Sequence, residues 1–236
     1  MSNLKALRFA IASLLAIGIS STAKADGIFR PTSFKVTFYE IGLRNSSTGA
    51  RNPIFQSNDG RQVNLSNPAT INLANGGRPQ SGSWDQAYAL FSNTIGLAGT
   101  DGAGCYIRGG ASDTDSDGSW EIVTNNAALS GEATTTETSF GFGFLGPGTP
   151  AVASSVNGTA VNNLRSYLVS STNPIPGGGG AIDRFLFIGT LASPVTITDS
   201  NSGTINYTVN TSRALETSGG CASVSYSNTT FNISIE

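Results

Sequence analysis

Residues 33–41 read SFKVTFYEI, and this stretch decides the fold class. Phe34, Val36 and Phe38 occupy alternate positions, so in an extended chain they share one face. The residues between them are polar or amphipathic and fall on the opposite face. This period of two predicts a strand with one buried face.

Comparable short segments recur along the chain, separated by clusters of Gly, Pro, Asn and Ser that are typical of turns. They lie at residues 61–65, 70–73, 84–97, 105–107, 120–123, 184–191, 195–198, 204–209, 223–226 and 230–235. Regularly spaced strands with turn signals between them predict an all-β fold. We expect an antiparallel β-sandwich or jelly-roll-like single domain over residues 26–236.

Two segments leave room for helix. Residues 84–97 fit one or two strands, with a short helix over 84–91 as the alternative. In residues 161–168 the apolar side chains stand at 161, 164 and 168, which is helical spacing. This second segment therefore predicts a short helix.

The first 25 residues have the pattern of a cleavable signal peptide. Lys5 and Arg8 precede a mostly apolar run at 9–19, and small residues lead to Ala-Lys-Ala at 23–25. The alternative, a membrane-anchoring helix, would need an apolar run of ~20 residues. We expect a secreted protein, extracellular or at the cell surface, with the periplasm as the alternative destination.

The charge balance argues against some partners. The chain has 13 basic and 15 acidic residues, and three of the basic ones lie in the predicted signal peptide. Ten basic residues then face 15 acidic ones, a net charge of −5, and the arginines are scattered singly. Nucleic acids and anionic membranes require clustered Lys and Arg. We expect no nucleic-acid partner, and no membrane span once the signal peptide is removed.

The chain has two cysteines, Cys105 and Cys221. In an oxidising compartment such a pair predicts one disulfide, which would join the middle of the chain to its last strands. Free or intermolecular thiols are the alternative.

The absence of histidine restricts the possible chemistry. Ser-His-Asp and Cys-His arrangements are excluded, as are zinc sites built on His. A glycosidase needs only two carboxylates, so that alternative stays open. Its candidate acids are Glu121, Glu132, Glu137 and Asp85, and their spacing selects no pair. We expect a protein that is not an enzyme.

Residues 113–118 read DTDSDG, which matches the first half of a calcium loop. The second half departs from an EF-hand, because Thr124 stands where a bidentate glutamate belongs. A solvated acidic turn is the alternative. The candidate calcium ligands are Asp113, Asp115, Asp117 and Glu121.

Trp84 and Trp120 each follow a Gly-Ser pair, which places them at strand entrances near loops. An exposed tryptophan there could serve as a stacking platform for a sugar ring. The alternative is that both are partly buried core residues, the commoner position for tryptophan.

In composition the chain resembles bacterial secreted surface proteins, with a bacterial-type signal peptide and a β domain rich in Gly, Ser, Thr and Asn. Chaperone-assembled pilus subunits share this composition, but they place two cysteines close together early in the domain. No motif is shared.

These observations predict a non-enzymatic structural or surface protein, a component of a cell surface, a fibre or the extracellular matrix. Its expected partner is a second copy of the chain, in a homopolymer formed by strand addition through the mature N-terminal run, residues 26–41. The alternative is a calcium-dependent carbohydrate-binding or adhesion module, with cell-surface glycans as partners.

Overall fold

A computed structural model describes residues 27–66, 70–72, 79–107, 133–136, 154–200, 205–218 and 223–235. Several predictions fall outside these ranges and stay predictions. They concern the signal peptide, Trp120, Cys221, the candidate calcium ligands, the acids Glu132 and Glu137, and the strand at 120–123.

The described residues form strands and no helix, so the predicted all-β class is confirmed. The long strands run from 11 to 14 residues. The strands are β1 (Ile28–Phe29), β2 (Ser33–Arg44), β3 (Arg51–Asn64), β4 (Thr70–Asn72), β5 (Gly82–Ser92), β6 (Thr94–Thr100), β7 (Tyr106–Ile107), β8 (Ala133–Thr136), β9 (Ser155–Val156), β10 (Thr159–Val169), β11 (Arg184–Ile197), β12 (Ile205–Ser218) and β13 (Ser223–Ile235).

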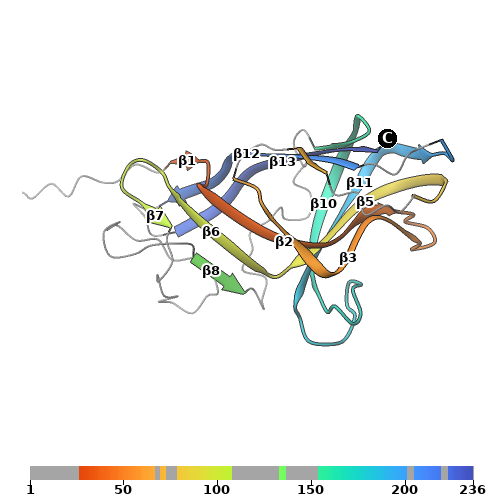
Figure 1. The fold of residues 1–236 in the computed structure, drawn as a ribbon, viewed down its shortest axis with the longest axis horizontal. Coiled ribbons are helices and arrows are strands. Elements are labelled where there is room, and N and C mark those ends of the chain that lie inside the picture. The colour runs from red at the N-terminus through yellow and green to blue at the C-terminus, as the bar shows by residue number, and fades with distance from the viewer. Residues whose placement is uncertain are drawn as a thin grey trace, which may run out of the picture.

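All 13 strands belong to one sheet, whose main path runs β1-β12-β13-β9-β10-β11-β5-β2-β6-β7. β3, β4 and β8 pair with β2, β12 and β6, respectively. The sheet is mixed because β9 and β13 are parallel, whereas every other pairing is antiparallel. It curls into a half-barrel, with β12 and β13 along one side and β2, β5 and β6 along the other (Figure 1). The two separate sheets of a sandwich or jelly roll are not shown.

The segment that decides the fold class lies in the middle of this sheet. Residues 33–41 fall within β2, which is flanked by β3 on one edge and by β5 and β6 on the other. Strand addition needs an unpaired edge. Residues 33–41 are therefore not available for strand addition in the folded chain, and the predicted homopolymer itself stays a prediction.

The predicted helix at 161–168 is also wrong, because these residues lie in β10. The pairing of β10 with β11 shifts register between Asn162 and Arg165. This bulge adds a residue, so Val161 and Leu164 both point inward at a spacing of three, which imitates a helix. Residues 84–91 likewise form strand, in β5.

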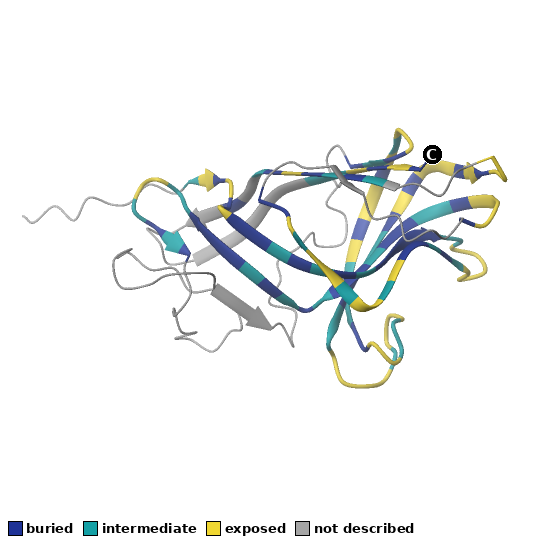
Figure 2. Cartoon of the chain, viewed as in Figure 1, coloured by how far each residue is buried: buried dark blue, intermediate teal, exposed yellow. Residues whose placement is uncertain are grey.

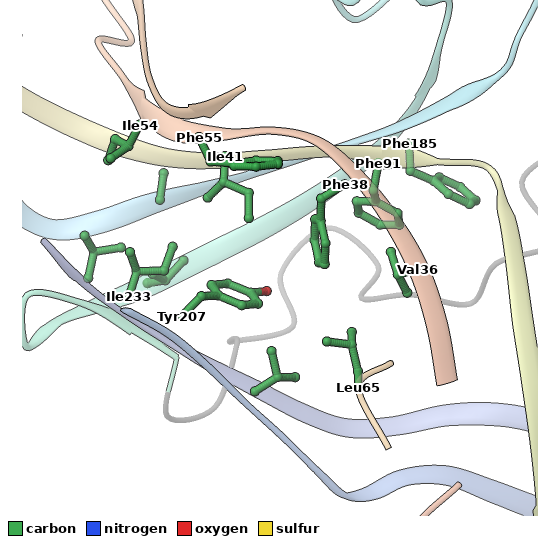
Figure 3. Close-up of a cluster of buried hydrophobic side chains, with 14 of the residues drawn as sticks. Val36, Phe38, Ile41, Ile54, Phe55, Leu65, Phe91, Phe185, Tyr207 and Ile233 are labelled. Atoms are coloured by element: carbon green, nitrogen blue, oxygen red, sulfur yellow. The ribbon is translucent and has the colours of Figure 1, made fainter. Parts of the chain in front are cut away.

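The inner face of the half-barrel holds the core. Phe38 of β2 packs against Phe91 of β5, with ring centroids 6.0 Å apart, and against Tyr207 of β12, at 5.7 Å. Phe91 in turn contacts the rings of Phe185 and Phe187 in β11. These rings line the space between the two sides of the curled sheet (Figure 3).

Burial alternates along the strands that lie beside this core, as the banding in Figure 2 shows. The opposite, outer face of β5, β10 and β11 carries a second and smaller apolar cluster. Its buried members are Tyr88, Leu90, Val169 and Leu186. The sheet therefore presents two differently built faces.

Candidate binding groove

The strand register gathers polar side chains on the outer face of the sheet. Arg44 of β2 pairs with Gln86 of β5, which pairs with Thr190 of β11. In the next row, Ile188 of β11 pairs with Arg165 of β10. Residues from four strands far apart in the sequence thus form one patch.

This patch is hollowed into a cavity of about 340 Å³, which we call the arginine groove. The loop between β10 and β11 contributes Pro176 to its wall. The volume lies in the range of small-ligand sites, roughly 300–1,000 Å³. The lining residues are Arg44, Gln86, Asn163, Arg165, Tyr167, Pro176, Ile188 and Thr190.

A bulge shapes the β10 side of the groove. Asn163 has a φ of 47°, in the left-handed region that residues other than glycine rarely adopt. It lies in the register shift between Asn162 and Arg165. Bulges re-aim the side chains next to them and are frequent beside functional sites. Here the groove is lined by Asn163 within that shift and by Arg165 and Tyr167 after it.

The groove is basic. Arg44 donates a hydrogen bond to Gln86, and Arg165 is exposed. None of the described lining residues is acidic. The acid next in sequence to Gln86 is Asp85, whose carboxylate accepts hydrogen bonds from the amide (2.8 Å) and hydroxyl of Ser46. The Ser46 hydroxyl is the main cause that holds the pKa of Asp85 below its ordinary value.

The other acid on this face, Glu40, is already engaged. Tyr88 donates a hydrogen bond to its Oε1 atom, and Arg51 Nη1 lies 3.7 Å from the same oxygen. The Arg51 guanidinium also lies over the Tyr88 ring, 5.9 Å from its centroid. Burial, with the neighbouring Glu40 charge, raises the pKa of Tyr88. Glu40 therefore compensates Arg51, which does not line the groove. The Arg44 charge also helps to lower the pKa of Asp85, so it is partly compensated from outside the groove, whereas Arg165 is exposed.

A glycine makes this internal network possible. A Cβ atom at Gly42 would lie 2.3 Å from the Asn52 carbonyl oxygen and 2.8 Å from the Tyr88 hydroxyl. No side chain fits at that distance. Gly42 thus lets the Tyr88 hydroxyl cross the sheet surface to reach Glu40.

The predicted sugar platform at Trp84 has no exposed face. Trp84 is 6 % exposed and belongs to the inner core cluster. Its indole Nε1 is buried and has no hydrogen-bond partner among the described residues. Trp84 is therefore a core residue, as the alternative interpretation of its sequence position had it. Trp120 lies outside the described residues.

The other predicted sites are only partly described. Asp85, the one candidate catalytic acid within the described ranges, is tied to the turn at Ser46; the rest, Glu121 included, lie outside. Cys105 is 1 % exposed and directly precedes β7, and Cys221 lies outside the described ranges. The disulfide and the calcium site stay predictions.

The described ranges contain neither a cluster of metal ligands nor a helix that could span a membrane. No three His, Cys, Asp or Glu residues there are grouped so that they could hold a metal ion. In the same ranges, no helix has the length and apolarity to cross a membrane.

Sequence reasoning did not find the arginine groove. Arg44 and Arg165 stand as isolated arginines in the sequence, and only the register of four strands brings them together. The local signal that could have pointed to the groove is the Asn162-Asn163 pair, because Asn tolerates the left-handed region better than most residues.

The comparisons with known proteins add no relative. No protein-family model matches the chain, and no curated protein or solved structure is similar to it. Any conclusion about function therefore depends on the sequence and the structure of this chain.

Proposed function

We propose that this chain is a non-enzymatic extracellular surface protein that binds an acidic saccharide in the arginine groove. The observation that carries the proposal is the groove itself, where Arg44 and Arg165 line one cavity together with Tyr167. In a chain with an excess of acidic residues, a cavity lined by two arginines and no described acid favours an anionic ligand.

The lining chemistry suits a uronic-acid sugar in particular. A guanidinium presents a planar fork of donors that matches a carboxylate. Gln86, Asn163 and Thr190 supply donors and acceptors for hydroxyl groups. The ring of Tyr167, with Ile188 and Pro176, supplies apolar surface for the face of a sugar ring.

The extracellular location remains part of the proposal and is supported by the charged, apolar and small-residue pattern of residues 1–25. The proposed Cys105–Cys221 disulfide is supported by the strand register. Phe29 of β1 pairs with Leu215 of β12, and a Cβ atom at Gly99 of β6 would lie 2.9 Å from the Phe29 ring. Both β6 and β12 therefore contact the short strand β1. The contact on β6 lies near its end, shortly before Cys105, and the contact on β12 lies near its end, shortly before Cys221.

Calcium is a separate proposal. The DTDSDG sequence at residues 113–118 supports it, and the described groove does not depend on it. Saccharide binding measured in chelator and in millimolar calcium tests the two proposals separately.

The test is calorimetric titration of the purified protein with hexuronate oligosaccharides and with neutral hexose oligosaccharides of equal length. We expect binding to the hexuronates and a fall of about 10-fold or more for Arg165→Gln, because hydrogen bonds to charged groups contribute roughly 1.5–3 kcal/mol. Arg44→Gln should give a comparable loss.

The matched control is Arg30→Gln, which removes the same charge from an exposed position between β1 and β2. It should leave binding within about twofold. Equal affinity for the neutral and acidic oligosaccharides, or equal losses in Arg165→Gln and Arg30→Gln, would contradict the proposal.

A further inference from the structure

The inner side of the half-barrel contains an apolar cavity of about 80 Å³, on the opposite face of the sheet from the arginine groove. It lies between the β2–β5 side and the β12–β13 side of the core. Its lining residues are Phe34, Val36, Phe38, Leu65, Phe91 and Tyr207, with further apolar side chains from β5, β6, β10, β11, β12 and β13.

One polar group enters this cavity, the hydroxyl of Tyr207. The residue is 7 % exposed, and no hydrogen bond to a described residue contributes to the pKa of its hydroxyl. Figure 3 shows the oxygen directed into the space bordered by Phe38, Val36 and Leu65. Burial alone raises the pKa of Tyr207, so the hydroxyl is neutral and available as a donor.

The Tyr207 ring is held in this direction by its neighbours. Its centroid lies 5.7 Å from that of Phe38, in an edge-on arrangement, and 6.1 Å from that of Phe231, in a stacked one. Rotation of the ring away from the cavity would break both contacts. The hydroxyl is therefore a fixed feature of the cavity wall.

An unpartnered hydroxyl in an apolar space is costly, and buried polar groups normally have partners. The cavity exceeds what one water molecule needs, but a buried water requires two to four polar partners and the described lining offers one. A dry cavity would leave the hydroxyl unpaired. An occupant that is mostly apolar and carries one oxygen acceptor satisfies both the walls and the hydroxyl.

We propose that this cavity binds a small apolar molecule with a single hydrogen-bonding oxygen, which accepts from Tyr207. Cavities of about 150 Å³ lined by apolar side chains take up benzene. At about 80 Å³ this one fits a more compact occupant, on the scale of a short-chain alcohol. The inference is independent of the proposed function, because the two sites lie on opposite faces of the sheet.

The experiment uses ethanol and propane as probes, which have the same number of non-hydrogen atoms and a size that suits a cavity of about 80 Å³. Each is titrated into the purified protein while the NMR signals of the cavity residues are followed. We expect both probes to shift these signals in the unchanged protein. Tyr207→Phe should weaken the binding of ethanol by about 2- to 10-fold, the range of one hydrogen bond, and should leave the binding of propane unchanged.

Ala89→Leu provides the second variant, because Ala89 lines the cavity and a larger side chain there fills it. It should reduce binding of both probes, and a preserved amide spectrum shows that the fold is intact. Hexuronate binding at the arginine groove should be the same in all variants, which separates this test from the previous one.

Two results would overturn the inference. If neither probe shifts the cavity signals in the unchanged protein, the space is filled by the chain itself. If Tyr207→Phe weakens both probes equally, the hydroxyl does not select the ligand.

Discussion

The two faces of the strands β2, β5 and β11 differ in how they hold their side chains. On the inner face, rings pack on rings: Phe91 lies 5.5 Å from Phe185 and 4.7 Å from Phe187, centroid to centroid. On the outer face, Tyr88, Glu40 and Arg51 form a polar network beside a small apolar cluster. Neighbouring residues of one strand thus belong to different environments.

We expect the inner face to determine the stability of the fold and the outer face to determine ligand binding. The inner face excludes water over a large apolar area, which is the main source of folding free energy. The outer face keeps charged and hydrogen-bonding groups near solvent, where they can exchange water for a ligand. A substitution on one face should therefore change one property and spare the other.

The largest effect is expected for Phe91→Ala. Truncation of a buried phenylalanine costs about 3–5 kcal/mol through lost burial and a new cavity. Leu90→Ala, one residue away on the outer face, should cost about 2–3 kcal/mol, because its cluster is smaller. Urea unfolding of both variants measures the difference between their losses in the free energy of unfolding. A larger loss for Leu90→Ala would show that the outer face carries the fold.

Glu40→Gln tests the polar network within the outer face. The change removes the charge that faces Arg51 and weakens the acceptor of the Tyr88 hydrogen bond. Arg51 Nη1 is buried and has no hydrogen-bond partner in the described residues, so its charge would lose compensation. We expect a loss of about 1–3 kcal/mol by urea unfolding.

Arg51→Met in the Glu40→Gln background distinguishes the cause. It removes the uncompensated charge and should restore part of the stability. No recovery would mean that the Tyr88 hydrogen bond, rather than the ion pair, is the important contact.

The smallest effect is expected at Asp85, which tethers the turn between β2 and β3 through Ser46. Because the folded-state pKa of Asp85 is lowered, its contribution is present above the unfolded-state pKa of about 4 and is lost as the pH falls through the folded-state value. Asp85→Asn should cost about 0.5–1 kcal/mol at pH 7.

The same variant should also flatten the acid side of the stability curve, measured by thermal unfolding between pH 7 and pH 2. Ser46→Ala is the matched control, because it removes the principal donor and keeps the carboxylate. If the acid slope persists unchanged in both variants, Asp85 is not its source.

Much of the fold could be predicted from the alternation of apolar residues, and the failures have one physical cause. Residues 34–38 keep a strict period of two, because one face of this part of β2 is buried, and a register shift between Phe38 and Glu40 interrupts the period before Ile41. In β10 the bulge near Asn163 breaks that period and imitates a helix. In β11 a register shift between Thr190 and Val195 made one strand resemble two.

The site was less predictable than the fold, because its residues come from four strands. Strand register depends on pairing with distant residues, which local sequence does not encode. Arg44 and Arg165 come to line one groove only because Arg44 pairs with Gln86 of β5 and Arg165 pairs with Ile188 of β11. Trp84, the most conspicuous candidate in its segment, belongs to the core instead.

The pairing of β1 with β12 sets the order in which the chain can fold. Ile28 and Phe29, the first strand residues described, pair with Glu216 and Leu215 near the other end of the chain. The inner face of β2 and β5 is likewise covered only when Tyr207 of β12 packs against Phe38. Because contacts between residues so far apart in sequence slow folding, the core can form only after the last strands have been made. A chain stopped before β12 would lack Tyr207 and would leave that inner face uncovered.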